Sequence, residues 1–175
     1  MSMGQTSFFV DIKREKEITA MSDFDNKRWS NEVKNWSGQV KDWNSRVIEE
    51  FRANGGKVGG TYEGAILLLL TTTGARSGKP HVAPLGYLID GEDGGRLIIA
   101  ASVLGADHHP AWYHNLVAHP TVTVELGSET FEATATVITG EERERLWAWT
   151  TQQWPLLAEH QAKTTRQIPL VALQR

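Results

Sequence analysis

Three side chains suited to anion binding stand together in one predicted turn. Arg76, Ser77 and Lys79 belong to the segment 74–80, GARSGKP, which follows the apolar run 65–70, AILLLL. An apolar run of this length bounded by turn residues predicts a buried strand. The turn therefore presents backbone N–H groups, a hydroxyl and two cations at a strand end, which suits a phosphate or another anion. The alternative interpretation is an ordinary solvated turn, which uses the same residue types.

A second segment whose residues could bind a ligand is 100–115, AASVLGADHHPAWYHN. Small residues at a predicted strand end let a flat ligand approach the backbone closely. The Ser102 hydroxyl can donate and accept a hydrogen bond, and Trp112 offers a large flat apolar wall. This segment therefore predicts a site for a flat ring.

Reactive side-chain chemistry is otherwise scarce. His108, His109 and His114 suggest a metal, but no carboxylate or fourth ligand stands at the usual spacing, so we expect solvated or capping histidines and no metal. No nucleophile elbow surrounds a serine, and no pair of carboxylates stands out for acid–base hydrolysis. An anion-binding turn beside a flat-ring wall fits a protein whose cofactor supplies the chemistry.

Length and composition narrow the class further. A chain of 175 residues predicts one domain, and a net charge of −3 argues against binding to nucleic acid. The absence of cysteine excludes disulfides and thiolate sites and favours a cytoplasmic protein. No apolar stretch of the sequence approaches the length of a membrane span.

The chain before the predicted strands divides into two parts. Residues 1–22 lack periodicity and are interpreted as a flexible N-terminal segment, whereas residues 23–54 form an amphipathic helix that ends at the sequence 54–56, NGG. One stripe of that helix holds apolar residues at alternating spacings of 3 and 4, namely Trp29, Val33, Trp36, Val40, Trp43 and Val47. The stripe predicts cover for one face of the domain. The alternative is peripheral membrane or partner contact through Trp29, Trp36 and Trp43.

Residues 60–175 form the third region and are predominantly β. The predicted strands lie near 64–72, 80–89, 96–102, 121–126, 129–138 and 167–173. Tight turns at 91–95 and 126–129 predict hairpins, and short helices are expected at 110–117 and 141–149. Short antiparallel strands with helices at the rim predict a mainly β, α+β fold built on a small barrel.

Four blocks in order carry a resemblance to a known family. They are LLTTTGARSGKP at 69–80 with PL at 84–85, AAS at 100–102, HPAWYHNL at 109–116, and RQIPLV at 166–171. Together they resemble the deazaflavin-dependent nitroreductase family of actinobacteria, which are coenzyme F420-dependent reductases with a split β-barrel, FMN-binding-like fold. The helix before the barrel resembles the N-terminal extension of that family.

The resemblance implies a cofactor site and a substrate site. Coenzyme F420 is strongly anionic, and Arg76, Ser77 and Lys79 match the loop that binds its tail. The positions that match the ring-binding walls are Pro84, Leu85, Ala101, Ser102, Pro110, Ala111 and Trp112. Ser102 is the candidate catalytic residue, because it can hydrogen bond near the ring or the substrate. The positions that match the substrate-binding residues are Trp154, Leu157 and His160.

The implied activity is hydride transfer from reduced F420 to an electron-poor acceptor, which is an enone, a quinone or a nitroaromatic. Two groups of positions depart from the family pattern. Ala75, His81 and Val103 stand where cations are common, and Trp154, Leu157 and His160 stand where the family member that activates nitroimidazole drugs has tyrosines. Two alternatives stay open, an FMN-binding split-barrel oxidoreductase and a non-catalytic carrier of F420 or a lipid. Split barrels occur as monomers and dimers, so neither state is favoured.

Overall fold

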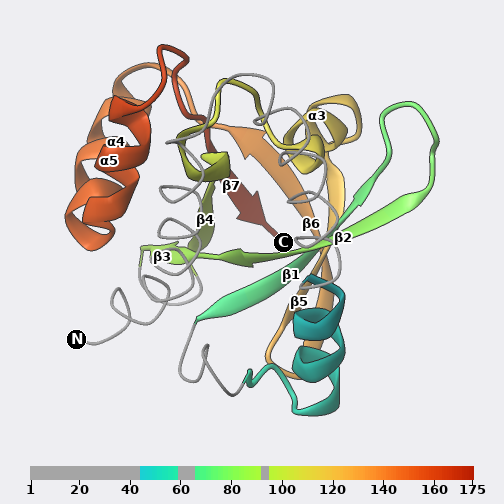
Figure 1. Cartoon of the computed structure of the whole chain (residues 1–175). Helices are drawn as coiled ribbons and strands as arrows, with labels where there is room; N and C mark the ends of the chain where they lie inside the picture. Colours follow the sequence, from blue (N-terminus) through green and yellow to red (C-terminus); the bar gives the residue numbers. More distant parts are fainter. Residues whose placement is uncertain (1–43, 59–65, 92–94) are drawn as a thin grey trace, which may run out of the picture.

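The computed structural model describes residues 44–58, 66–91 and 95–175. Their strands form one antiparallel sheet in the order β2-β1-β5-β6-β7-β4-β3 (Figure 1). The strands are β1 (Leu67–Thr73), β2 (Pro80–Gly86), β3 (Leu88–Asp90), β4 (Arg96–Ala100), β5 (Thr121–Leu126), β6 (Glu129–Val137) and β7 (Leu170–Gln174). The predicted hairpins are confirmed, since β3 pairs with β4 and β5 pairs with β6.

The two ends of the sheet are joined by a single residue. β2 and β3 lie at opposite ends of the strand order, yet only Tyr87 separates them in the chain. The sheet must therefore curl until its edges meet, which gives the predicted split barrel (Figure 1). The sequence predicted one strand over 80–89. The structure divides it at Tyr87, because the hydrogen-bonding partner changes there from β1 to β4.

The apolar run of β1 is buried on both faces. Side chains alternate along a strand, so Leu68 and Leu70 enter the barrel interior, whereas Leu67 and Leu69 face outward. The outward pair packs against Val47 and Phe51 of the helical segment 44–53. This double burial explains why the run does not alternate with polar residues.

The helical segment 44–53 ends as the sequence predicts. Gly55 and Gly56 have positive φ of 62° and 93°, and the Gly56 N–H donates to the Phe51 carbonyl at 2.8 Å. Val47, the last member of the predicted stripe, is buried against β1. The other stripe residues and the segment 1–22 lie outside the described residues. Within the described ranges, no helix is long and apolar enough to cross a membrane.

Three further helices flank the sheet. They are α3 (Ala111–Ala118), α4 (Gly140–Gln153) and α5 (Pro155–Ala162). The first two were predicted, although α4 is longer than expected, and α5 was missed. Figure 1 shows α4 and α5 together beside β3 and β4, whereas α3 lies near the far end of the β1–β2 hairpin.

α4 and α5 each pack against the sheet through apolar side chains. Leu146 of α4 packs against Ile98, and Leu157 of α5 packs against Leu88. A buried arginine adds a polar link, because Arg143 donates to the Ile168 carbonyl at 2.8 Å while its guanidinium lies 4.9 Å from the centre of the Trp147 ring. These contacts fix the chain that leads into β7.

Candidate functional site

The predicted anion-binding turn connects β1 to β2 and is closed on itself by backbone hydrogen bonds. The Gly74 N–H donates to the Lys79 carbonyl at 2.8 Å, and the Gly78 N–H donates to the Gly74 carbonyl at 3.0 Å. The Ser77 hydroxyl oxygen accepts from the Lys79 N–H at 3.2 Å. A hydroxyl in this position still has its own O–H to donate. The turn therefore presents a fixed backbone with a free hydroxyl proton.

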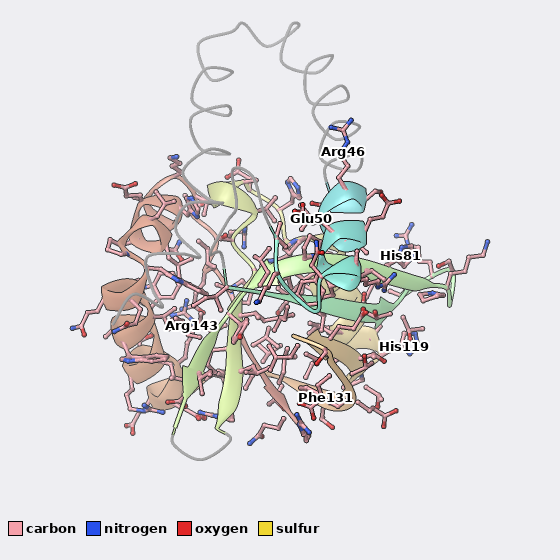
Figure 2. The ribbon with its side chains drawn as sticks, turned by 90° about the horizontal axis from the view of Figure 1, so that it is seen from below. Arg46, Glu50, His81, His119, Phe131 and Arg143 are labelled. Carbon is pink, nitrogen blue, oxygen red and sulfur yellow. The ribbon has the colours of Figure 1, made fainter. Side chains whose placement is uncertain are left out.

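The charges of the turn face solvent. Arg76, Ser77 and Lys79 are all exposed. Within the described residues, no carboxylate forms an ion pair with Arg76 or Lys79. A Cβ added at Gly74 would overlap the Ser77 hydroxyl and lie 3.0 Å from His81 Nε2, so the imidazole lies against the turn. Figure 2 shows His81 on the side of the molecule away from Arg143. The donor set fits an anionic group.

A buried amide ties this turn to α3. The Asn115 carboxamide oxygen accepts from the Ala75 N–H at 3.0 Å, and its Nδ2 donates to the Thr72 hydroxyl at 3.1 Å. Asn115 lies almost one turn of helix after Trp112, so the same helix carries the aromatic wall and the clamp on the turn. The two segments that the sequence singled out are thus brought together. Sequence reasoning missed Asn115, although it stood inside the quoted HPAWYHNL block.

The residues predicted to bind the ring come from β2, from the chain that follows β4 and from the start of α3. Leu85 of β2 and Trp112 of α3 are half-buried and pack against the same apolar core. Pro84 and Ala101 are buried, Ser102 and Pro110 are half-buried, and Ala111 is exposed. Among the described residues, no side chain or backbone group hydrogen bonds with the Ser102 hydroxyl, so it can donate to a ligand.

A second clamp holds the chain from Ala101 to His109. The Arg166 guanidinium donates to three carbonyl oxygens, those of Ser102 at 2.7 Å, Ala106 at 2.7 Å and Ala101 at 3.1 Å. It also lies 3.0 Å from His109 Nδ1. Arg166 opens the RQIPLV block at 166–171, but nothing in the sequence predicts this role for it. The contacts span 57 to 65 residues of sequence, which no local pattern reveals.

Burial shifts the pKa of both partners in this clamp. Desolvation lowers the pKa of Arg166, and the neighbouring Asp107 carboxylate opposes that shift. Desolvation also lowers the pKa of His109, and the Arg166 charge lowers it further, followed by His114 and His108. His109 is therefore held toward its neutral form.

Of the predicted substrate-binding residues, Trp154 lies at the junction of α4 and α5, and Leu157 and His160 lie on α5. Trp154, Leu157 and His160 are 7 %, 4 % and 1 % exposed. Trp154 and Leu157 pack against Leu88 and Ile168 rather than lining an open surface. The C-terminal end of α5 nevertheless approaches the 3-10 helix η2 (Val103–Gly105), which directly follows Ser102. A Cβ added at Gly105 would lie 2.6 Å from the His160 carbonyl oxygen. Their role toward substrate stays a prediction.

The histidines of the segment form a ring cluster. The His109 and Tyr113 ring centres lie 4.6 Å apart, and those of His109 and His114 lie 5.8 Å apart. Within the ranges that the structure covers, no group of three or more histidine, cysteine or acidic side chains could hold a metal ion.

Comparison with known proteins decides the family. Residues 43–175 match the family described as F420H(2)-dependent quinone reductase. The chain belongs to this family. An F420H(2)-dependent quinone reductase of Mycobacterium tuberculosis is 35 % identical over 129 residues, covering 71 % of this chain and 85 % of the relative. A putative one from the same organism is 36 % identical over 107 residues, covering 61 % of this chain and 87 % of the relative.

Solved structures agree with the fold. An F420-H2 dependent reductase (FDR-A) is 40 % identical, with a TM-score of 0.54, covering 62 % of this chain and 93 % of that chain. A chain described as a domain-swapped dimer is 35 % identical, with a TM-score of 0.58, covering 79 % of this chain and 98 % of that chain. The predicted resemblance to F420-dependent split-barrel reductases is confirmed. The protein is an F420-dependent oxidoreductase, and coenzyme F420 is its cofactor.

Proposed function

We propose that this reductase transfers a hydride from F420H2 to a quinone. The observation that carries the proposal is the family match over residues 43–175, together with the relatives whose names specify a quinone. Enones and nitroaromatics are the competing acceptor classes.

The turn between β1 and β2 is the proposed binding site for the anionic tail of the cofactor. Arg76 and Lys79 are exposed, and within the described residues no carboxylate pairs with them. The backbone of the turn is already fixed by its own hydrogen bonds, so little order has to be gained on binding. Ser77 adds a hydroxyl donor. These features support charge-assisted binding of a phosphate or carboxylate.

The ring lies, in this proposal, against the walls that α3 and the barrel provide. Trp112 and Leu85 offer apolar surface, and Ala101 leaves room for close approach to the backbone. Pro110 and Ala111 extend the wall at the start of α3, whereas Pro84 pairs with Leu69 and faces the side of β2 opposite to Leu85. When bound, the reduced deazaflavin supplies a hydride from its C5 carbon. The protein contributes alignment and exclusion of water.

Ser102 is the proposed hydrogen-bond donor to developing negative charge. A quinone oxygen gains negative charge when its ring accepts a hydride, and a fixed donor lowers that barrier. The Ser102 hydroxyl has no hydrogen-bond partner among the described residues, while its carbonyl is held by Arg166 and by the Gly105 N–H at 2.9 Å. The backbone is thus fixed and the hydroxyl is available.

The substrate wall is assigned to Trp154, Leu157 and His160 of the α5 region. Because these side chains are buried, direct contact with an acceptor requires local opening between α5 and η2. The closeness of α5 to the chain after Ser102 supports this assignment.

Two measurements on the whole chain test the proposal. Titration with F420 and separately with FMN, followed by fluorescence, should give much tighter binding of F420. Anaerobic oxidation of F420H2 is then followed with menadione, cyclohexenone and a nitroimidazole, and we expect the quinone to give the highest kcat/KM. Tight binding of F420 with no turnover of any acceptor would instead favour a carrier. Preference for an enone or a nitro compound would overturn the quinone assignment.

A further inference from the structure

The chain between β4 and α3 adopts a conformation that its own residues do not favour. Val103 has a φ of 44°, which a β-branched residue rarely adopts. The carbonyl just before it, that of Ser102, accepts two hydrogen bonds, one from the Gly105 N–H at 2.9 Å and one from Arg166 at 2.7 Å. Such a conformation persists only where the surroundings hold it. Arg166 is therefore one of the contacts that maintain the backbone at Ser102.

The hydrogen bond between Arg166 and His109 also determines the tautomer of the imidazole. Arginine has only N–H donors and no acceptor, so His109 Nδ1 must accept from Nη1. The neutral ring then carries its proton on Nε2. Protonation of His109 would place two donors and two positive charges against each other, and this hydrogen bond would be lost.

The other groups around His109 do not replace that bond. The charged or titratable neighbours are Asp107, His108, Tyr113 and His114, besides Arg166 itself. Asp107 accepts from the Thr164 hydroxyl at 3.1 Å, so its carboxylate is already bound to the same chain that carries Arg166. The hydrogen bond between Arg166 and His109 thus depends on a neutral His109 ring.

We propose that Arg166 and His109 are paired positioning residues, which hold Ser102 and the start of α3 at the distance that the cofactor ring requires. Arg166 donates hydrogen bonds to the Ala101 and Ser102 carbonyls, which directly follow β4. It also donates to His109, which directly precedes Pro110. The inference rests on the proposed ring-binding walls. It adds that acidification to the point where His109 takes up a proton weakens F420 binding and slows hydride transfer.

The first test uses the cofactor-free full chain. Nitrogen-15 NMR of the histidine rings should show His109 as the Nε2–H tautomer. In Arg166→Lys, whose ammonium cannot reproduce the fork of four contacts, we expect loss of that tautomer preference and protonation of His109 at higher pH. The control is Arg52→Lys, which alters a two-bond pair with Glu125 on the helical segment. An Nδ1–H tautomer, or the same titration in both variants, would overturn the proposal.

The second test measures F420 affinity against pH. For the wild type we expect Kd to rise at least several-fold as the pH falls from 7.5 to about 4.5, because burial and the Arg166 charge lower the pKa of His109 and so move its protonation below the usual histidine range. His109→Asn should be nearly independent of pH over that range, since the amide oxygen takes the place of Nδ1 as acceptor and does not protonate.

The outcomes separate the two levels of inference. An equal loss of affinity in wild type and His109→Asn would refute the role of His109. Absence of F420 binding by the wild type at pH 7.5 would refute the proposed cofactor site, while the NMR result would still decide the tautomer. Thermal unfolding of Arg166→Lys shows whether that variant still folds or whether only the segment 101–109 has moved. If Arg166→Lys does not fold, His109→Asn supplies the test.

Discussion

Replacing Asn115 by alanine tests whether α3 and the anion-binding turn act as one unit. The substitution removes two hydrogen bonds, to Thr72 at 3.1 Å and to the Ala75 N–H at 3.0 Å. A typical hydrogen bond contributes about 0.5–1.5 kcal/mol, so we expect a loss of about 1–3 kcal/mol in the free energy of unfolding. For a chain of this size that corresponds to a Tm lower by roughly 2–12 °C.

The same substitution should also weaken binding of the F420 cofactor. Without Asn115 the turn loses its link to the helix that carries Trp112, so the proposed tail site and the proposed ring site would no longer be held in fixed positions relative to each other. We expect F420 affinity to fall by about ten-fold, which corresponds to about 1.4 kcal/mol. Urea unfolding measures the first effect and fluorescence titration the second.

Two companion variants make the result decisive. Thr72→Val removes only the bond on the strand side and should lower stability with a smaller effect on F420. Asn115→Asp keeps an acceptor for the Ala75 N–H but places a carboxylate beside the anionic tail, so affinity should fall further at low salt than at high salt. An Asn115→Ala protein that is less stable yet binds F420 as tightly as the wild type would refute the coupling.

Three other variants address the turn and the proposed catalytic hydroxyl. Arg76→Ala combined with Lys79→Ala should weaken F420 binding by about 1–3 kcal/mol, measured by titration, and unchanged affinity would remove the turn from the site. Ser102→Ala should leave F420 affinity nearly intact and slow hydride transfer by at least about ten-fold in stopped-flow measurements, since one positioned donor contributes about that much or more. Gly74→Ala should loosen the turn and weaken F420 binding, because the new Cβ would overlap the Ser77 hydroxyl.

The sequence predicted those features that depend on neighbouring residues. Both hairpins follow from local turn residues, and the end of the first helix follows from two glycines that adopt positive φ. The predicted anion-binding turn and the segment around Ser102 could be recognised in the sequence because each is contiguous. α5 was missed because Trp154 and Pro155 interrupt the helical pattern, although proline suits the first turn of a helix.

The features that the sequence did not reveal depend on distant partners. The division of the predicted strand at Tyr87 reflects a change of partner strand rather than any local signal. Asn115 and Arg166 hold their segments across 43 and 64 residues of sequence. A buried asparagine or arginine is visible as a residue type, but which carbonyl or hydroxyl it reaches is decided only when the barrel closes.

Burial of β1 on both faces has a consequence for how the chain unfolds. Leu67 and Leu69 are covered by Val47 and Phe51, which are 3 % and 1 % exposed, so the helical segment 44–53 and the outward face of β1 form an apolar cluster of their own beside the barrel core. Detaching that segment would leave a leucine-rich strand open to water and to other chains. We therefore expect the segment and β1 to lose protection from hydrogen exchange together, as one cooperative unit, and a shortened chain that begins after it to aggregate.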